Sequence, residues 1–248
     1  MPKLFVIAGH GAGDPGASGN GFTEAERVRV LAKRIKELGG GNVILGDLSR
    51  DYYRDNGVST LNLPGEYEIV ELHMDAGQAT ARGGHVIIYS GFQADDYDKA
   101  LADMLTDILP GRSQMIVRRD NLANPERAAM RGYGYRLVEF GFITNAEDVE
   151  IFNTRMDDIA GGVLAAFGIK EAENKTGGNE EMYEIMVVKG EKTHYYFDGS
   201  IHPCATQKEL DMIKEAYKRN TGKDLKTHVY QNKKDFQELV NLLARTAK

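Results

Sequence analysis

Two histidines and two glutamates stand at points where the chain changes character. His10 follows the first apolar run, Glu24 opens a charged helical stretch, and His73 and Glu139 end two later apolar runs. Two imidazoles and one carboxylate form a three-ligand set typical of catalytic zinc, which leaves the fourth position for water. A second carboxylate is then needed to take the proton of that water, and Glu139 suits this role.

Each of these residues also has a simpler explanation. A single histidine at a strand end is more often a hydrogen-bonded structural residue, and a glutamate at a helix start is often a favourable partner of the helix dipole. Glu139 is different, because an unpaired carboxylate inside an apolar strand is costly. The separations of 14 and 49 residues between the three ligand candidates match no short metal motif. Spacing alone therefore leaves a metal hydrolase and a structural role equally open.

The apolar pattern predicts an α/β fold with a mostly parallel, twisted sheet flanked by helices. Strand-like runs occupy residues 3–9, 42–46, 68–74, 84–90, 114–119 and 135–140, and helical periods occupy residues 23–40, 95–109, 146–152 and 155–169. Ligands of such folds gather beyond the carboxyl ends of the strands. Parallel strands would bring His10, His73 and Glu139 to one edge, where the glycine-rich loop after His10 could return Glu24 to them.

The composition changes after residue 169. Residues 170–181 are polar, contain paired glycines and show no periodicity, so they are predicted to be a linker between a catalytic domain at 1–169 and a small domain at 182–248. The small domain has an α+β pattern of two strands around Gly190 and two helices with a short extended segment between them. Its length is near the lower limit for independent folding.

Charge and cysteine content narrow the function classes. The net charge is −6, but residues 182–248 carry 12 Lys and Arg against 9 Asp and Glu, while residues 1–181 carry 19 against 28. This argues against nucleic-acid binding by the larger segment. No apolar run is long enough for a membrane span and no signal segment is present, which predicts synthesis in the cytoplasm. The single cysteine, Cys204, excludes an internal disulfide framework and a cysteine-based zinc site.

Three ordered motifs carry a resemblance to a known family. They are "GHGAGDPGASGNGFTEAE" from residue 9, "ELHMDA" from residue 71 and "VEFGFITNAED" from residue 138. With these motifs, residues 3–168 resemble the zinc-dependent N-acetylmuramoyl-L-alanine amidases of the amidase type 3 family, which occur in bacterial autolysins and phage endolysins. Other zinc amide hydrolases, such as carboxypeptidases, and a wall-binding module with an inactive core are the alternatives.

The resemblance implies specific roles. His10, Glu24 and His73 would bind one Zn²⁺, and Glu139 would be the catalytic base for cleavage of the amide between N-acetylmuramic acid and L-alanine of the peptidoglycan stem peptide. Residues that bind the substrate are left unassigned, because 111–133 matches the family only loosely.

Several wider expectations follow from the resemblance and the composition. The chain is expected to be a bacteriophage endolysin that reaches the cell wall after release and causes cytolysis, or a bacterial autolysin of the same activity. Residues 182–248 are expected to bind wall polymers, with self-association as a second role. The peptide before Met182 can also be encoded by a purine-rich tract resembling a ribosome-binding site, which would make Met182 an internal start for a free C-terminal domain. A flexible polar linker is the favoured explanation of this peptide. His85 is expected to be structural, and His194, His202 and His228 are not expected to form a zinc site.

Overall fold

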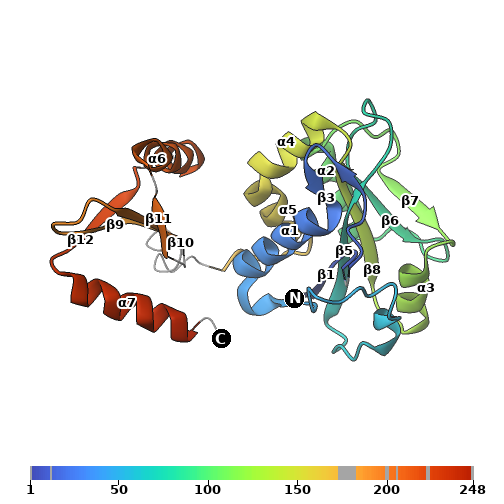
Figure 1. The fold of residues 1–248 in the computed structure, drawn as a ribbon. Helices are drawn as coiled ribbons and strands as arrows, with labels where there is room; N and C mark the ends of the chain where they lie inside the picture. Colours follow the sequence, from blue (N-terminus) through green and yellow to red (C-terminus); the bar gives the residue numbers. More distant parts are fainter. Residues whose placement is uncertain are drawn as a thin grey trace. The chain divides into compact units, whose positions relative to one another are not determined.

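The computed structural model describes residues 2–11, 13–172, 183–198, 201–204, 206–221 and 224–246. The chain divides into two compact units, Met1–Ala172 and Glu173–Lys248 (Figure 1). Most of the predicted linker and the candidate start at Met182 lie outside the described residues. Within the described residues, no helix has both the length and the apolar character needed to cross a membrane.

A six-stranded sheet forms the centre of the larger unit. Its strands lie in the order β4 (Val43–Leu45), β1 (Lys3–Ala8), β5 (Tyr67–Asp75), β8 (Tyr135–Phe142), β6 (His85–Tyr89) and β7 (Ile116–Arg119). All neighbouring strands are parallel except β6 and β8, which are antiparallel. The carboxyl ends of β1, β5 and β8 therefore meet at one edge of the sheet.

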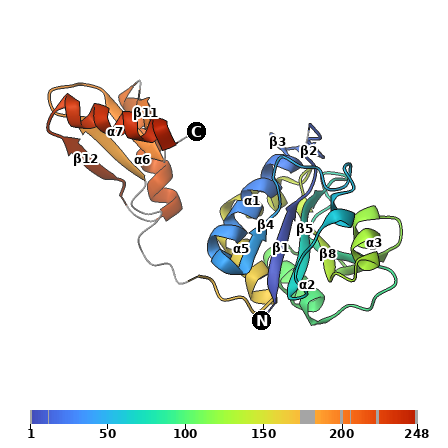
Figure 2. The ribbon, with the colours of Figure 1, turned by 90° about the horizontal axis from the view of Figure 1, so that it is seen from below.

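Three helices cover one face of this sheet (Figure 2). They are α1 (Glu24–Gly39), α2 (Asp96–Ile108) and α5 (Met156–Ala166). The predicted apolar face of α1 packs into the core, where all four of its residues are buried: Val28, Leu31, Ile35 and Leu38. Burial of this stripe against every second residue of the strands removes apolar surface from water, which favours folding. The predicted α/β fold with a mostly parallel sheet and flanking helices is confirmed.

The opposite face of the sheet carries a smaller core. Side chains of β1, β5 and β8 on this face pack against the 3₁₀ turn η2 (Gly57–Thr60), its preceding loop and the short helix α3 (Ala123–Met130). Residues alternate between faces along a strand, so Leu72 points to the helical layer while Glu71 and His73 leave β5 on the smaller core's face. Glu71 and His73 thus emerge between the sheet and α3.

Short elements complete the larger unit. The strands β2 (Ser18–Gly19) and β3 (Phe22–Thr23) pair within the loop that leads into α1, and η1 (Gly40–Asn42) follows α1. Helix α4 (Ala146–Thr154) follows β8 and begins at an Asn145 cap, whose side chain accepts from the backbone N–H groups of Glu147 and Asp148.

The smaller unit is built around a four-stranded sheet with strand order β11-β10-β9-β12. Its elements are β9 (Tyr183–Val188), β10 (His194–Asp198), β11 (Ile201–Cys204), α6 (Gln207–Thr221), β12 (Lys226–Tyr230) and α7 (Lys233–Thr246). Ile185 packs in one cluster with Leu210 of α6, whereas Met186 packs in another with Phe236 of α7. Because consecutive strand residues face opposite ways, the two helices cover opposite faces of this sheet.

Candidate metal centre

His10 lies in a turn held in the left-handed conformation. Its φ is 61°, which costs a residue with a Cβ free energy and needs support from its surroundings. Arg29 of α1 gives that support by donating Nη1 to the Gly9 carbonyl at 3.1 Å and Nη2 to the His10 carbonyl at 2.9 Å. Residue 9 must be glycine, because a Cβ there would lie 2.4 Å from His73 Cε1. The turn thereby brings the His10 ring against the His73 ring, with centroids 5.0 Å apart.

The glycine-rich loop folds back over His10. Asp14 Oδ2 lies 3.0 Å from His10 Nδ1, and Asp14 Oδ1 accepts from the backbone N–H of Gly16. Gly16 has φ 65°, and a Cβ there would lie 2.7 Å from both Glu24 Oε2 and His10 Cδ2. At Gly9 and Gly16 a side chain would clash with the candidate ligands, so glycine is needed there for the loop to pack closely over the site.

Glu24 is the first residue of α1, and its side chain turns back toward the sheet. Its Oε2 accepts from the backbone N–H of Ala17 at 3.0 Å, and its Oε1 accepts from that of Met74 at 3.1 Å. The residue is only 4% exposed. These bonds fix both carboxylate oxygens in a buried position, which a helix-capping role alone would not require.

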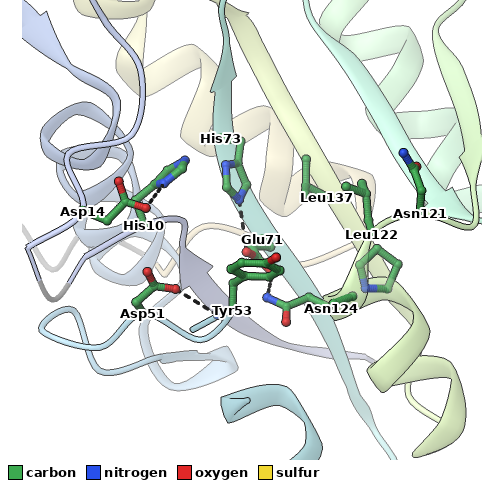
Figure 3. Close-up of a pocket in the computed structure, with 12 residues that line it drawn as sticks. His10, Asp14, Asp51, Tyr53, Glu71, His73, Asn121, Leu122, Asn124 and Leu137 are labelled. Atoms are coloured by element: carbon green, nitrogen blue, oxygen red, sulfur yellow. Dashed lines mark hydrogen bonds and ion pairs between the residues drawn. The ribbon is translucent and has the colours of Figure 1, made fainter. Parts of the chain in front are cut away.

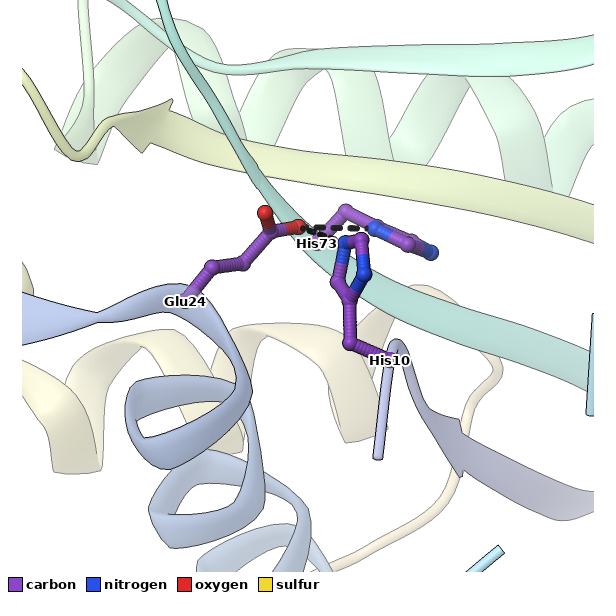
Figure 4. Close-up of side chains that lie close together, drawn as sticks. All are labelled: His10, Glu24 and His73. Carbon is purple, nitrogen blue, oxygen red and sulfur yellow. Dashed lines mark hydrogen bonds and ion pairs between the residues drawn. The ribbon is translucent and has the colours of Figure 1, made fainter. Parts of the chain in front are cut away.

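The side chains of His10, Glu24 and His73 converge (Figure 4). Glu24 Oε1 lies 3.0 Å from His10 Nε2 and 2.8 Å from His73 Nδ1. One ligand atom from each residue lies within 4.8 Å of the others, and no other such cluster exists among the residues that the structure describes. Two imidazole nitrogens with one carboxylate oxygen match the donor set of catalytic zinc sites. The cluster can hold a metal ion.

The electrostatics of the cluster favour a positive charge at its centre. Burial by itself raises the pKa of Glu24, but contacts with His10 and His73 outweigh it and bring that pKa well below its ordinary value. Burial lowers the pKa of both histidines, and hydrogen bonds to carboxylates, Glu24 above all, more than compensate, so both pKa values are raised. The ionised Glu24 therefore attracts either protons or a cation to the two rings.

Glu139 lies beside His73 across the sheet. The two residues are direct partners in the parallel register of β5 and β8, so their side chains leave the same face. Burial raises the pKa of Glu139 to about 7, against the opposing charge of His73. Its Oε2 is buried and has no hydrogen-bond partner in the described part of the chain. A carboxylate with this pKa and a free oxygen is suited to exchange a proton with a ligand near neutral pH.

The segment after Glu139 is held by a buried aspartate. Asp148 accepts from the backbone N–H groups of Phe142 and Gly83, both at 2.8 Å, and is fully buried. Gly141, between Glu139 and this anchor, has φ 81° and lies against Asp148. The third sequence motif therefore combines one candidate catalytic carboxylate with one carboxylate that fixes the backbone after it.

A cavity of about 340 Å³ opens beside the two histidines (Figure 3). Its lining combines polar groups with apolar side chains, the composition expected of a ligand site. The lining residues are His10, Asp14, Asp51, Tyr53, Glu71, His73, Asn121, Leu122, Ala123, Asn124, Pro125 and Leu137. Several of them come from the region 111–133, to which the sequence assigned no substrate residues.

Glu71 and Asn124 are residues of this site that sequence reasoning missed. Both are buried and polar, and they are hydrogen bonded to each other. Glu71 carried a usable signal, since it is an acidic residue in an apolar strand just as Glu139 is. Asn124 carried none, because nothing local distinguishes it from a loop asparagine.

The other histidines stay outside the cluster. His85 is 5% exposed, and burial lowers its pKa to about 4, so it is neutral at ordinary pH. Beyond the larger unit, no metal-binding group that includes His194 or His228 is found among the described residues. The side chain of His202 lies outside the described part.

Comparisons with solved structures agree with this fold. The CwlD amidase from Clostridioides difficile, in complex with the GerS lipoprotein, is 20% identical with a TM-score of 0.54, over 66% of this chain and 96% of that one. The catalytic domain of the CD27L endolysin targeting Clostridia difficile is 20% identical with a TM-score of 0.51, over 66% and 98%. At this identity the likeness concerns the fold.

Two curated relatives extend the comparison. Probable autolysin PH of Staphylococcus aureus is 32% identical over 239 residues, which are 89% of this chain and 47% of the relative, so the chain spans about half that protein's length. The sporulation-specific N-acetylmuramoyl-L-alanine amidase of Bacillus subtilis is 24% identical over 196 residues, 75% of this chain and 74% of the relative. A family model described as N-acetylmuramoyl-L-alanine amidase matches residues 4–169, well over half of the chain. The chain therefore belongs to the N-acetylmuramoyl-L-alanine amidase family.

Proposed function

We propose that this chain hydrolyses the amide bond between the lactyl carbonyl of N-acetylmuramic acid and L-alanine of the peptidoglycan stem peptide, with Zn²⁺ as its cofactor. The observation that carries the proposal is the convergence of His10, Glu24 and His73 beside Glu139, in a domain whose sequence belongs to the amidase family. Both an autolysin and an endolysin catalytic domain are similar to it. The comparisons therefore support cleavage of this bond, and they fit a bacterial autolysin and a phage endolysin equally well.

The donor set fits zinc better than the harder divalent cations. Zn²⁺ takes imidazole nitrogen and carboxylate oxygen in tetrahedral sites, whereas Ca²⁺ and Mg²⁺ prefer oxygen ligands alone. The three ligand atoms lie within 4.8 Å of one another, and two of the three residues, His10 and His73, line a cavity. When bound, the ion would supply Lewis acidity to the scissile carbonyl and to a water molecule.

Glu139 would carry the proton in this reaction. With its pKa raised to about 7 by burial, its carboxylate can accept a proton from the attacking water and then donate it to the departing amine of L-alanine. Its Oε2, which is buried without a hydrogen-bond partner among the described residues, is the oxygen left to bind this proton. The residue is not a ligand in the three-residue cluster, so it is free to move protons.

The cavity next to the cluster would hold the substrate. It is bordered by Tyr53, a residue that is 62% exposed, and by Asn121 and Leu122 before α3. An exposed aromatic ring offers an apolar surface to a sugar or peptide, and the polar neighbours offer hydrogen bonds. The position of the cavity, beside His73 and away from the helical layer, supports approach of the glycan strand from the side of α3.

We further propose that the C-terminal unit binds wall polymers. The match to the S. aureus autolysin covers 89% of the chain, so it extends beyond the family domain into this unit. The unit is compact by itself and its segment has a net positive charge. Self-association through this unit stays a prediction, which sedimentation of the full chain would test.

Digestion of purified cell walls tests the enzymatic proposal. The zinc-loaded protein should release new L-alanine amino termini, and Glu139→Gln should lower that rate on the order of 10²-fold or more while retaining zinc and fold. New reducing sugar ends would instead indicate a glycosidase, and amino acids released from the carboxyl end of the stem peptide would indicate a carboxypeptidase. A Glu139→Gln variant with the parental rate would remove Glu139 from the mechanism.

A further inference from the structure

Glu71 is a buried carboxylate next to the metal centre that the proposed reaction does not use. It lies two residues before His73 on β5 and is 3% exposed. Its Oε1 lies 3.0 Å from His73 Nε2, and its Oε2 accepts from Asn124 Nδ2 at 2.9 Å (Figure 3). The Tyr135 hydroxyl also donates to Oε2. A buried carboxylate is costly unless such bonds satisfy it, and here both oxygens are occupied.

The two nitrogens of His73 face different partners. Nδ1 points to Glu24 and the centre of the cluster, whereas Nε2 points to Glu71. A carboxylate accepts hydrogen bonds, so Nε2 is the nitrogen that carries the hydrogen in a neutral ring. The lone pair then lies on Nδ1, which is the nitrogen that faces the other two candidate ligands.

Two elements from different parts of the sequence, α3 and β8, hold the Glu71 carboxylate in place. Asn124 belongs to α3, and its amide orientation is set because Arg127 Nη1 donates to its Oδ1 at 2.9 Å, which leaves Nδ2 for Glu71. Tyr135 begins β8, the neighbouring strand. Since these partners sit on a helix and a strand, the carboxylate is held more rigidly than a loop residue would be.

We propose that Glu71 is a positioning residue that fixes the orientation and tautomer of His73 for metal binding, with Asn124 and Tyr135 anchoring it. The proposal rests on the proposed function, because it assumes that His73 is a ligand. Carboxylates that accept from the second nitrogen of a metal-bound histidine fix its ring and tautomer and increase its basicity. Asp14 contacts His10 in the same way, but its side chain is 38% exposed and Glu71 is enclosed.

The zinc dissociation constant, measured by competition with a chromogenic chelator, tests this role without reference to amidase activity. Glu71→Gln should weaken zinc binding roughly 10- to 100-fold, because one amide hydrogen must now face a donor. Tyr135→Phe should cause a smaller loss, because it only loosens the carboxylate. Glu66→Gln makes the same chemical change at an exposed residue paired with Lys3, and it should bind zinc as the parent does.

A double variant separates positioning from a general structural effect. If Tyr135 acts through Glu71, Tyr135→Phe should weaken zinc binding in the parent but should have little further effect in Glu71→Gln. Selective ¹⁵N labelling of histidine should also show hydrogen on Nε2 of His73 in the zinc-loaded parent. An unchanged zinc dissociation constant in Glu71→Gln, or full additivity of the two losses, would overturn the proposal.

Three further outcomes each decide the test. If Glu71→Gln does not fold, as judged by circular dichroism of the metal-free protein, Tyr135→Phe carries the test by itself, and an unchanged zinc dissociation constant in that variant would overturn the proposal. If the parent binds zinc tightly and cleaves walls while Glu71→Gln binds zinc equally well, only the positioning role fails. If the parent itself does not bind zinc, the proposed metal chemistry fails, and the positioning role fails with it.

Discussion

Glycines in the loop between β1 and α1 differ in what surrounds them. A Cβ on Gly16 would meet Glu24 and His10 at 2.7 Å, whereas one on Gly13 would meet nothing within 4 Å, although both residues have positive φ. Gly16→Ala and Gly13→Ala should therefore share a backbone cost of about 1 kcal/mol, but only Gly16→Ala should weaken zinc binding. Calorimetric titration of zinc into both metal-free variants checks this, and equal zinc affinities would contradict it.

The two candidate histidine ligands should make the stability of the metal-free protein fall as pH rises, whereas zinc binding should strengthen over the same pH range. The pKa values of both histidines are raised in the metal-free folded protein, so their protonation stabilises the fold. This stabilisation is fully present below the unfolded pKa of about 6.5, and it is lost as pH rises through the folded pKa. Zinc needs neutral imidazoles, so its binding strengthens over the same rise. The gap between Tm in zinc and Tm in chelator should widen from about pH 6 to about pH 8. A constant gap would argue against these ligands.

Among single residues, the sequence predicts site residues best where a polar or charged side chain stands in an apolar segment. Glu139 stands out because a carboxylate in an apolar strand is rare, and His10 because it interrupts a buried strand with glycine. Glu71 is likewise a carboxylate in an apolar strand, but the sequence pattern assigns it only to the strand at 68–74 and gives it no role. Asn124 reaches Glu71 only because α3 packs onto the sheet, which no local pattern records.

At the scale of elements, strong periodicity predicted the six strands of the larger sheet and four of its helices. The reversed direction of β6 was not predictable, because a buried apolar strand reads the same in either direction. Helix α3 was missed because it has eight residues, contains Pro125 and buries little apolar surface. Strand β11 was missed because it contains Pro203, which fits its place at the edge of its sheet.

Asp148 of α4 links β8 to the segment before β6, and its removal should be costly. Asp148→Ala would leave the buried N–H groups of Gly83 and Phe142 without an acceptor, which should lower the free energy of unfolding by roughly 2–5 kcal/mol. The neighbouring Glu147→Ala removes only an exposed pair with Arg82 and should cost less than about 1 kcal/mol. Urea denaturation of the two variants compares them, and similar midpoints would contradict the anchoring role.

At the scale of the whole molecule, the division into two compact units suggests a division of tasks. Residues 1–172 should retain cleavage of a soluble muropeptide but act more slowly on intact walls, because surface attachment raises the effective substrate concentration. A fluorescent fusion of residues 183–248 should bind purified walls without the larger unit. Equal wall activity of residues 1–172 and the full chain, together with no binding by the fusion, would assign the smaller unit another task.

Isotopic labelling from water shows directly which bond this protein hydrolyses. Zinc-loaded protein and a soluble muropeptide with a complete stem peptide are incubated in H₂¹⁸O, and the products are analysed by mass spectrometry. Hydrolysis of the lactyl amide should leave one ¹⁸O in the lactyl carboxylate of N-acetylmuramic acid and an unlabelled peptide with a free L-alanine amine. Label in a peptide carboxylate or at the sugar's anomeric carbon would contradict it.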